Sequence, residues 1–310
     1  MRARVSEVGA WPMQDPRAGS ATIDIRSSPA TAMSDLFDPA PAASGQPRIR
    51  VGIGGWTYAP WRGGVFYPEK LVQRRELEYA SRHVTAIEIN GTYYGAQKPE
   101  TYARWRDETP PGFVFTAKAP KRIMASRRLA GTGAQVQDFA GGIATLGDRL
   151  GAILWQFGRG QSPSLEALAD FVALLPPEVD GLRLRHALEL RDPAAFTPEL
   201  LALLRRHNIA LVAAASDEHP SFADITADFV YARVMQARAG LAQGYADAEL
   251  DAWAARARAW HAGEDPADLA HVGPPLPPAK PREVFVFFIA AAKERNPAAA
   301  MALLQRLSAA

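Results

Sequence analysis

The residues of this chain that could carry chemistry are two glutamates and three cations, each at the end of a short apolar run. The run Thr85–Tyr94 starts with β-branched residues, contains Glu88 and Asn90, and ends in a glycine, a threonine and two tyrosines. A carboxylate in an otherwise buried strand is costly unless it is paired or functional. The run therefore predicts where in the chain the protein works.

A second carboxylate has a similar setting, because Glu189 ends an apolar run and is followed two residues later by Arg191. Side chains alternate along a strand, so Glu88 shares a face with Asn90, and Glu189 shares a face with Arg191. The two carboxylates could act as a general acid–base pair, or one could simply fix an arginine. Both interpretations remain open from the sequence.

Three cations, Lys118, Arg191 and Arg233, lie at corresponding positions of other apolar runs. Arginine binds phosphate and carboxylate groups bidentately, so we expect an anionic small molecule as the ligand. The predicted catalytic residues are Glu88 and Glu189, and the predicted ligand-binding residues are Asn90, Tyr93, Lys118, Gln156, Arg191, Arg233 and Trp56. The segment Lys118–Arg128 holds five cations, which leaves a nucleic-acid backbone possible as a partner, beside the alternative of a solvated basic loop.

Eight short apolar runs predict the strands that position these side chains, and segments of helical spacing lie between them. The predicted strands are Ile49–Gly54, Thr85–Asn90, Phe113–Lys118, Gly151–Gln156, His186–Leu190, Ile209–Ala214, Phe229–Val234 and Val284–Ile289. Repeated strand–helix alternation predicts an α/β fold in which a parallel sheet closes into a TIM-type (β/α)8 barrel with outer helices. An open, doubly wound sheet is the competing interpretation.

Helix starts are predicted where a capping side chain precedes a proline, as in Ser162-Pro163, Thr197-Pro198 and Asn296-Pro297. The glycines of Gly52–Gly55 do not form a P-loop, because no Gly-Lys-Ser/Thr follows them. We expect them to let the chain turn over the end of the barrel, with Trp56, Tyr58 and Trp61 forming a lip.

No metal site is predicted, because the six histidines show no metal-ligand spacing. A magnesium-type site built from Glu88, Glu189 and Asn90 stays open without support from spacing. Nothing in the sequence identifies a cofactor.

Composition bounds the class of protein. The chain has 310 residues, of which 48% are hydrophobic and 22% charged, and its net charge of +2 does not indicate a general nucleic-acid or membrane-surface binder. It has no cysteine, which excludes thiolate catalysis and fits a reducing compartment, so we expect a cytoplasmic protein. No run approaches the length of a membrane span, and no obligate protein partner is evident.

The first 47 residues mix Pro, Ala, Ser and Asp without sustained periodicity. We expect residues 1–47 to be a disordered leader and residues 48–310 to form a single barrel domain. Met33 is an alternative start of translation.

The motifs, taken in order, resemble those of domain of unknown function 72, the YecE-like family. The matching motifs are Gly52-Ile-Gly-Gly-Trp56, Tyr58 with Trp61-Arg62-Gly63, Phe66-Tyr67-Pro68, Glu88-Ile-Asn90, Thr92-Tyr93-Tyr94, Lys118-Ala-Pro120, Leu154-Trp-Gln156, Glu189-Leu-Arg191 and Thr226 to Arg233. The resemblance covers about Ile49 to Leu307 and implies a TIM-barrel fold. It implies no established activity.

This chain departs from the family pattern at several polar positions. Asp192 stands where the family usually has histidine, and Ala215 lies near its usual aspartate. Met235-Gln236 follows Arg233 where the family often has His-Gly, and the asparagine common at the end of the last strand is missing from Phe287–Ala290. Either the chain belongs to a subgroup with a different ligand, or catalysis has been lost. The hypotheses are therefore an enzyme acting on an anionic substrate, and a non-catalytic module that binds a phosphorylated ligand or nucleic acid.

Overall fold

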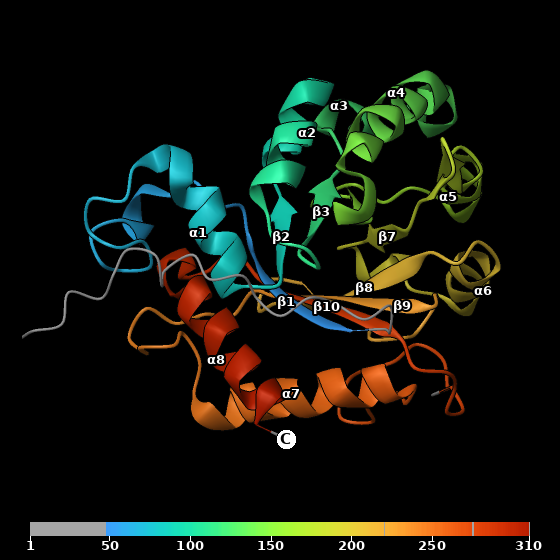
Figure 1. The fold of residues 1–310 in the computed structure, drawn as a ribbon. Coiled ribbons are helices and arrows are strands. Elements are labelled where there is room, and N and C mark those ends of the chain that lie inside the picture. Colours follow the sequence, from blue (N-terminus) through green and yellow to red (C-terminus); the bar gives the residue numbers. More distant parts are fainter. Residues whose placement is uncertain (1–47, 220, 275, 310) are drawn as a thin grey trace, which may run out of the picture.

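A closed barrel of eight parallel strands forms the centre of the molecule in the computed structural model, which describes residues 48–219, 221–274 and 276–309 (Figure 1). The barrel strands are β1 (Ile49–Gly54), β2 (Ala86–Ile89), β3 (Val114–Lys118), β4 (Leu150–Gln156), β7 (His186–Glu189), β8 (Ala210–Ala215), β9 (Phe229–Val234) and β10 (Glu283–Phe288). The short strands β5 (Glu178–Val179) and β6 (Leu182–Arg183) form a separate antiparallel pair. The predicted strands are confirmed, and no strand end differs from its prediction by more than one residue.

The first and last strands close the barrel, which settles the choice between a barrel and an open sheet. β1 pairs in parallel with β10 from Ile49 opposite Val284 to Ile53 opposite Phe288, and β1 also pairs with β2. An open sheet would leave β1 or β10 as an edge with unpaired backbone groups. The TIM-type barrel is therefore confirmed.

Helices surround the barrel, as Figure 1 shows, and cover the outward-facing apolar residues of the strands. They are α1 (Glu76–His83), α2 (Pro99–Glu108), α3 (Lys121–Met124), α4 (Gly133–Ile143), α5 (Leu165–Val172), α6 (Pro198–Arg206), α7 (Asp247–Ala262) and α8 (Asn296–Ser308). The expected alternation fails at one connection, because the described residues between β8 and β9 contain no helix.

Only one of the three predicted helix caps is present as expected. Thr197 caps α6 and accepts a hydrogen bond from the Leu200 nitrogen at 3.2 Å. The prediction for Ser162 is wrong, because Ser164 caps α5 by accepting from the Ala167 nitrogen at 3.2 Å. The prediction for Asn296 is also wrong: its backbone is already helical, and its side-chain nitrogen donates to the Ala290 oxygen at 3.3 Å.

Small side chains on one half of the barrel and aromatic side chains on the other fill the interior. The alanines 86, 152, 187, 210 and 214 face inward, and Phe229, Tyr231, Phe285 and Phe287 reach across toward them from β9 and β10. This alternation of small and large residues packs the interior to the density of a core. Side chains above this layer are thereby held at the carboxyl ends of the strands, which we call the mouth of the barrel.

The opposite end of the barrel is closed by an ion-paired group. Arg185 lies over the rings of Phe229 and Phe285, at 5.3 and 5.2 Å from their centroids. Its guanidinium bonds Glu283 at 2.5 Å, and Glu283 also bonds Arg50 at 2.7 Å. The end of the barrel opposite the mouth is therefore closed by packing and charge pairing, as expected for the amino ends of the strands.

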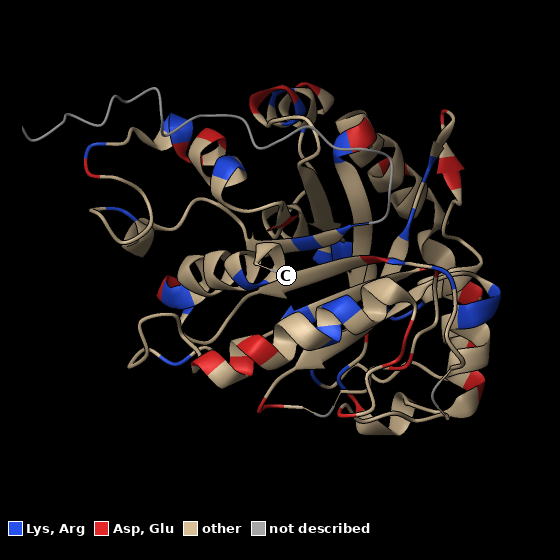
Figure 2. Ribbon diagram, turned by 60° about the horizontal axis from the view of Figure 1, so that its bottom comes forward, with Lys and Arg blue, Asp and Glu red and all other residues tan. Residues whose placement is uncertain are grey.

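In the view of Figure 2, positive and negative residues are interspersed over the described part of the ribbon. Within the described residues, every helix is too short or too polar to span a bilayer. The predicted leader, residues 1–47, lies outside the described residues.

Candidate active site

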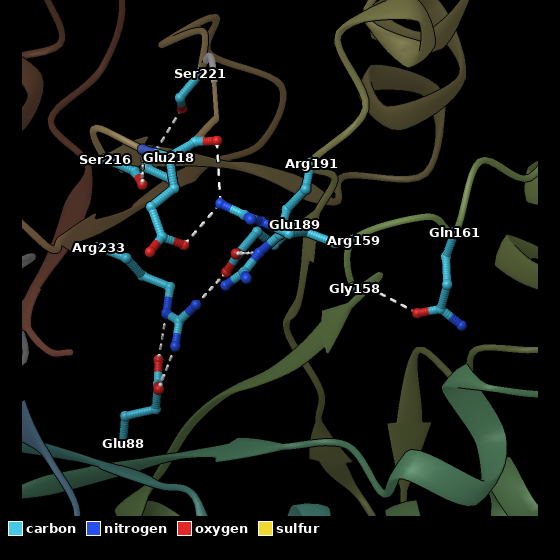
Figure 3. Close-up of polar contacts among 11 residues, drawn as sticks. Glu88, Gly158, Arg159, Gln161, Glu189, Arg191, Ser216, Glu218, Ser221 and Arg233 are labelled. Atoms are coloured by element: carbon cyan, nitrogen blue, oxygen red, sulfur yellow. Dashed lines mark hydrogen bonds and ion pairs between the residues drawn. The ribbon is translucent and has the colours of Figure 1, made fainter. Parts of the chain in front are cut away.

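Arg233 joins the two predicted catalytic carboxylates across the interior of the barrel (Figure 3). Its Nε and Nη2 donate to the two carboxylate oxygens of Glu88 at 3.0 and 2.9 Å, and its Nη1 donates to Glu189. Glu88 and Glu189 are fully buried, and Arg233 is 4% exposed. All three guanidinium nitrogens are thus occupied, which favours an organising role for Arg233 over direct contact with an anion.

Tyr231 adds a further contact to Glu88, and Thr116 in turn contacts Tyr231. The Tyr231 hydroxyl donates to the Glu88 carboxylate at 2.8 Å, and Thr116 lies 2.8 Å from the same hydroxyl. Burial raises the pKa of Tyr231 well above its usual value, so the hydroxyl keeps its proton and Thr116 must donate to it. Tyr231 and Thr116 were not among the predicted site residues. Strand alternation nevertheless places Tyr231 on the same face of β9 as Arg233, and Thr116 on the same face of β3 as Lys118.

Glu189 remains ionised in the structure. Burial by itself would raise the pKa of Glu189, but the charges of Arg233 and Arg191 outweigh it and lower the pKa to about 2. A group with this pKa cannot exchange protons efficiently near neutral pH. The structure therefore favours a positioning role for Glu189, and its predicted role in acid–base catalysis stays a prediction.

Arg191 differs from Arg233 because it keeps nitrogens available. Its Nε donates to Glu189 at 2.9 Å, and its side chain is 21% exposed. Within the described residues, its two terminal nitrogens make no hydrogen bond of ordinary geometry. Arg191 is therefore oriented by a buried carboxylate while two parallel donors stay available for an anion.

Lys118 ends β3 on the same face as Thr116, and it is partly exposed. Its Nζ lies 4.3 Å from the centroid of the Tyr93 ring, which comes from the turn after β2. Burial, followed by the charge of Arg233, lowers the pKa of Lys118 to about 8, although Glu88 and Glu189 act in the opposite direction. Lys118 is thus a group of this cluster that can change protonation near neutral pH.

Gln156 ends β4 directly beside Glu189 in the sheet register. The amide helps to lower the pKa of Glu189, but its buried nitrogen has no hydrogen-bond partner of ordinary geometry among the described residues. A buried amide nitrogen without a partner is costly, and a ligand oxygen would satisfy it.

Asn90 and Trp56 take different positions relative to this cluster. The Asn90 amide lies directly over Gly54, where an added Cβ would come within 3.0 Å of its nitrogen, so Gly54 makes room for it. Trp56 instead packs against Trp105 and Phe115, at centroid distances of 4.9 and 6.0 Å, on the helix side of the sheet. The expected aromatic lip is not formed as predicted, because Trp61 is fully buried.

Two of the residues that depart from the family pattern, Asp192 and Gln236, make hydrogen bonds within the structure. Asp192 accepts from the Ala194 nitrogen at 3.0 Å and caps a short helical turn. The Gln236 amide donates to Asp217 at 2.5 Å. Ala290 and Ala291 both have positive φ angles, 55° and 46°, which are strained for alanine.

No cluster suited to a metal ion is present within the described ranges. Above the buried group, Arg159 and Glu218 form an exposed ion pair at 3.0 Å between the loops after β4 and β8 (Figure 3). The arrangement is therefore a buried group of two carboxylates and Arg233 whose remaining negative charge is balanced by Arg191. Arg191, Lys118 and Gln156 present nitrogens beside this group.

The barrel fold agrees with the comparisons with known proteins. The model of the family "Protein of unknown function DUF72" matches residues 50–310, so the chain belongs to that family. The UPF0759 protein YecE of Escherichia coli K12 is 31% identical over 141 residues, which are 44% of this chain and 48% of YecE. YunF of Bacillus subtilis is 28% identical over 80 residues, 26% of this chain and 27% of YunF. The aligned segment thus spans about half the length of YecE, and less of YunF.

Solved structures share the fold. A DUF72 family protein from Thermotoga maritima superposes with a TM-score of 0.65 at 22% identity, covering 84% of this chain and 99% of that one. A DUF72 family protein from Enterococcus faecalis gives a TM-score of 0.62 at 18% identity, with coverage of 84% and 96%. At these identities the similarity establishes the fold alone.

Proposed function

We propose that the mouth of the barrel is the active site of an enzyme that acts on a small anionic substrate, carrying a carboxylate or a phosphate. The observation that carries the proposal is the set of hydrogen-bond donors next to the buried group of Glu88, Glu189 and Arg233. Arg191, Lys118 and Gln156 each present at least one side-chain nitrogen without a hydrogen-bond partner among the described residues. Donors of this kind bind anions strongly when they are held in place before the ligand arrives.

The charges of the cluster support an anionic ligand. Glu88 and Glu189 face Arg233, Arg191 and Lys118, so a protonated Lys118 leaves one positive charge in excess. The Glu88 carboxylate accepts hydrogen bonds from Arg233 and Tyr231. The carboxylates therefore hold the cations in place and are not available to bind a cationic ligand. In this arrangement Glu88, Glu189 and Arg233 position the binding groups, and Lys118 is the group suited to proton transfer.

The alternative function is a binding module without catalysis. A nucleic acid is the less favoured ligand, because the basic segment after β3 is partly neutralised: Arg122 pairs with Asp138 at 3.1 Å. The depressed pKa of Lys118 favours an enzyme, because a simple anion-binding site gains nothing from a lysine that is easier to deprotonate.

Titration calorimetry with inorganic phosphate and with oxalate tests the anion site. The Arg191→Met variant should bind these anions at least tenfold more weakly, since a charged hydrogen bond contributes about 1.5–3 kcal/mol. Arg191→Lys should restore little of the loss, because lysine has no planar fork. Arg183→Met is the matched control, as Arg183 is 67% exposed and pairs with Asp228 outside the site.

The pH dependence gives an independent check. Affinity for both anions should decrease as the pH rises through about 8, because Lys118 then loses its charge. Equal anion binding by wild type, Arg191→Met and Arg183→Met would rule out the proposed site.

A further inference from the structure

The Lys118 amine combines three properties of a reactive lysine. It is partly exposed at the mouth of the barrel. Its Nζ packs against the Tyr93 ring at 4.3 Å, and within the described residues it makes no hydrogen bond or ion pair. The Tyr93 ring is therefore the direct contact that favours the charged amine, and no carboxylate of the described residues bonds it.

The charged groups around Lys118 come from three other elements. Arg233 of β9 and Arg191, which follows β7, disfavour its protonation, whereas Glu88 of β2 and Glu189 of β7 favour it. Because burial and Arg233 dominate, the pKa falls to about 8, and roughly one amine in ten is neutral near pH 7. For an ordinary lysine the neutral fraction is below about one in a thousand. Burial next to another cation is an established way to activate a lysine as a nucleophile.

We propose that Lys118 is a nucleophile that forms an imine with the carbonyl group of a small 2-oxo acid, whose carboxylate is bound by Arg191. This inference rests on the proposed function and names its substrate class. Arg191 presents two terminal nitrogens that suit a carboxylate, and the lysine faces the same cluster. A 2-oxo acid has adjacent carboxylate and carbonyl groups, which supply one partner for each of these two residues.

The chemical step is balanced without a further reactant. The lysine nitrogen bonds to the carbonyl carbon and forms a carbinolamine. The carbonyl oxygen then leaves as water with the two amine protons, which produces a neutral C=N bond. Protonation of this imine by solvent gives an iminium, which withdraws electrons from the neighbouring carbon.

Reductive trapping tests the proposal. The full-length protein is incubated with pyruvate or glyoxylate and sodium cyanoborohydride, which reduces the C=N bond to a stable amine, and the adduct is located by peptide mass spectrometry. Lys118 should be modified at least tenfold faster than the exposed lysines 70, 98, 121 and 280, in proportion to its larger neutral fraction. Lys118→Arg and Lys118→Met should lose the adduct.

Two controls separate a specific adduct from general lysine reactivity. Lys293 is also partly buried and lies 4.5 Å from the Tyr58 ring centroid, and burial lowers its pKa as well. The Lys293→Met variant should keep the Lys118 adduct. Acetaldehyde has a carbonyl but no carboxylate, so its reaction at Lys118 should be slower and insensitive to Arg191→Met.

The outcomes distinguish this inference from the proposed function. If phosphate and oxalate bind through Arg191 but neither 2-oxo acid modifies Lys118 faster than the surface lysines, the nucleophile is refuted and the anion site stands. If both 2-oxo acids modify Lys118 equally fast in wild type and Arg191→Met, the carboxylate partner is refuted. If neither anion binding nor a Lys118 adduct is found, both proposals fail.

Discussion

Replacing Arg233 by methionine should destabilise the protein more than any exposed arginine substitution. Methionine keeps the apolar stem of the side chain but removes the guanidinium that bonds both Glu88 and Glu189. The two carboxylates are fully buried, so water cannot replace the lost partner.

Two independent arguments give the size of the effect. Removing one partner of a buried ion pair costs about 3–5 kcal/mol. The folded protein also lowers the pKa of Glu189 from 4.5 to about 2, which corresponds to about 3 kcal/mol of stability near neutral pH. Arg233 is the largest contributor to this lowering, and Arg191 and Gln156 supply the rest. We therefore expect a loss of about 3–5 kcal/mol and a decrease in melting temperature on the order of 10 °C.

Urea unfolding, followed by tryptophan fluorescence at several pH values, measures the effect. In wild type the pKa of Glu189 is lower when folded, so its contribution is present above about pH 4.5 and is lost as the pH falls toward 2. In Arg233→Met the same carboxylate is buried without Arg233, its pKa rises, and acidification relieves the variant. The stability difference between the two proteins should therefore shrink as the pH falls.

Arg183→Met is the control, and it should change the free energy of unfolding by less than about 0.5 kcal/mol because its ion pair is exposed. A loss below about 1 kcal/mol for Arg233→Met would contradict the reasoning. So would a stability difference that does not depend on pH.

Three further predictions follow from single contacts. Burial lowers the pKa of His186 to about 4, and its Nδ1 accepts a hydrogen bond from Trp155 at 3.0 Å. Histidine NMR should therefore show no titration of this ring above about pH 5. The free energy of unfolding should decrease as the pH falls from about 6.5 to 4, because the unfolded state then binds the proton more readily. Gly52→Ala places a Cβ 2.2 Å from the Ala86 oxygen and should lower the free energy of unfolding in urea by about 1–3 kcal/mol or more. Gly141→Ala is the control, because this helical glycine has open space around it, and the substitution should be neutral or stabilising. Ala290→Asn should stabilise by up to about 1 kcal/mol, because asparagine tolerates the positive φ of 55° better; an unchanged melting temperature would count against strain at this turn.

The sequence was sufficient for the strands because their signal is local. Ile87 and Ile89 alternate with Ala86 and Glu88, and this parity sets which side chains face inward. The closure of the barrel was less accessible, since it depends on β1 meeting β10 more than 200 residues later. The missing helix between β8 and β9 and the cap at Ser164 depend on loop geometry, for which the sequence offers several equivalent signals.

Strand parity also identified most of the cluster, including Glu88, Lys118, Glu189 and Arg233. It could not show how the charges are paired, because Arg233 reaches Glu88 across the barrel and occupies all of its own nitrogens in doing so. Trp56 was placed at the mouth because it follows β1 directly. Gly55 has a φ of 73°, and the Trp56 ring beyond it packs toward α2.

The protonation of the Lys118 amine is the most direct measurement of the central claim, that the mouth binds a small anion through Arg191 and a lysine of lowered pKa. Heteronuclear NMR of protein labelled in its lysines, with the signal assigned by Lys118→Arg, follows this titration. The pKa should be about 8 in the free protein and should rise when phosphate or oxalate is bound, since an anion favours the charged amine. A pKa near the ordinary 10.5 that neither anion changes would contradict the claim.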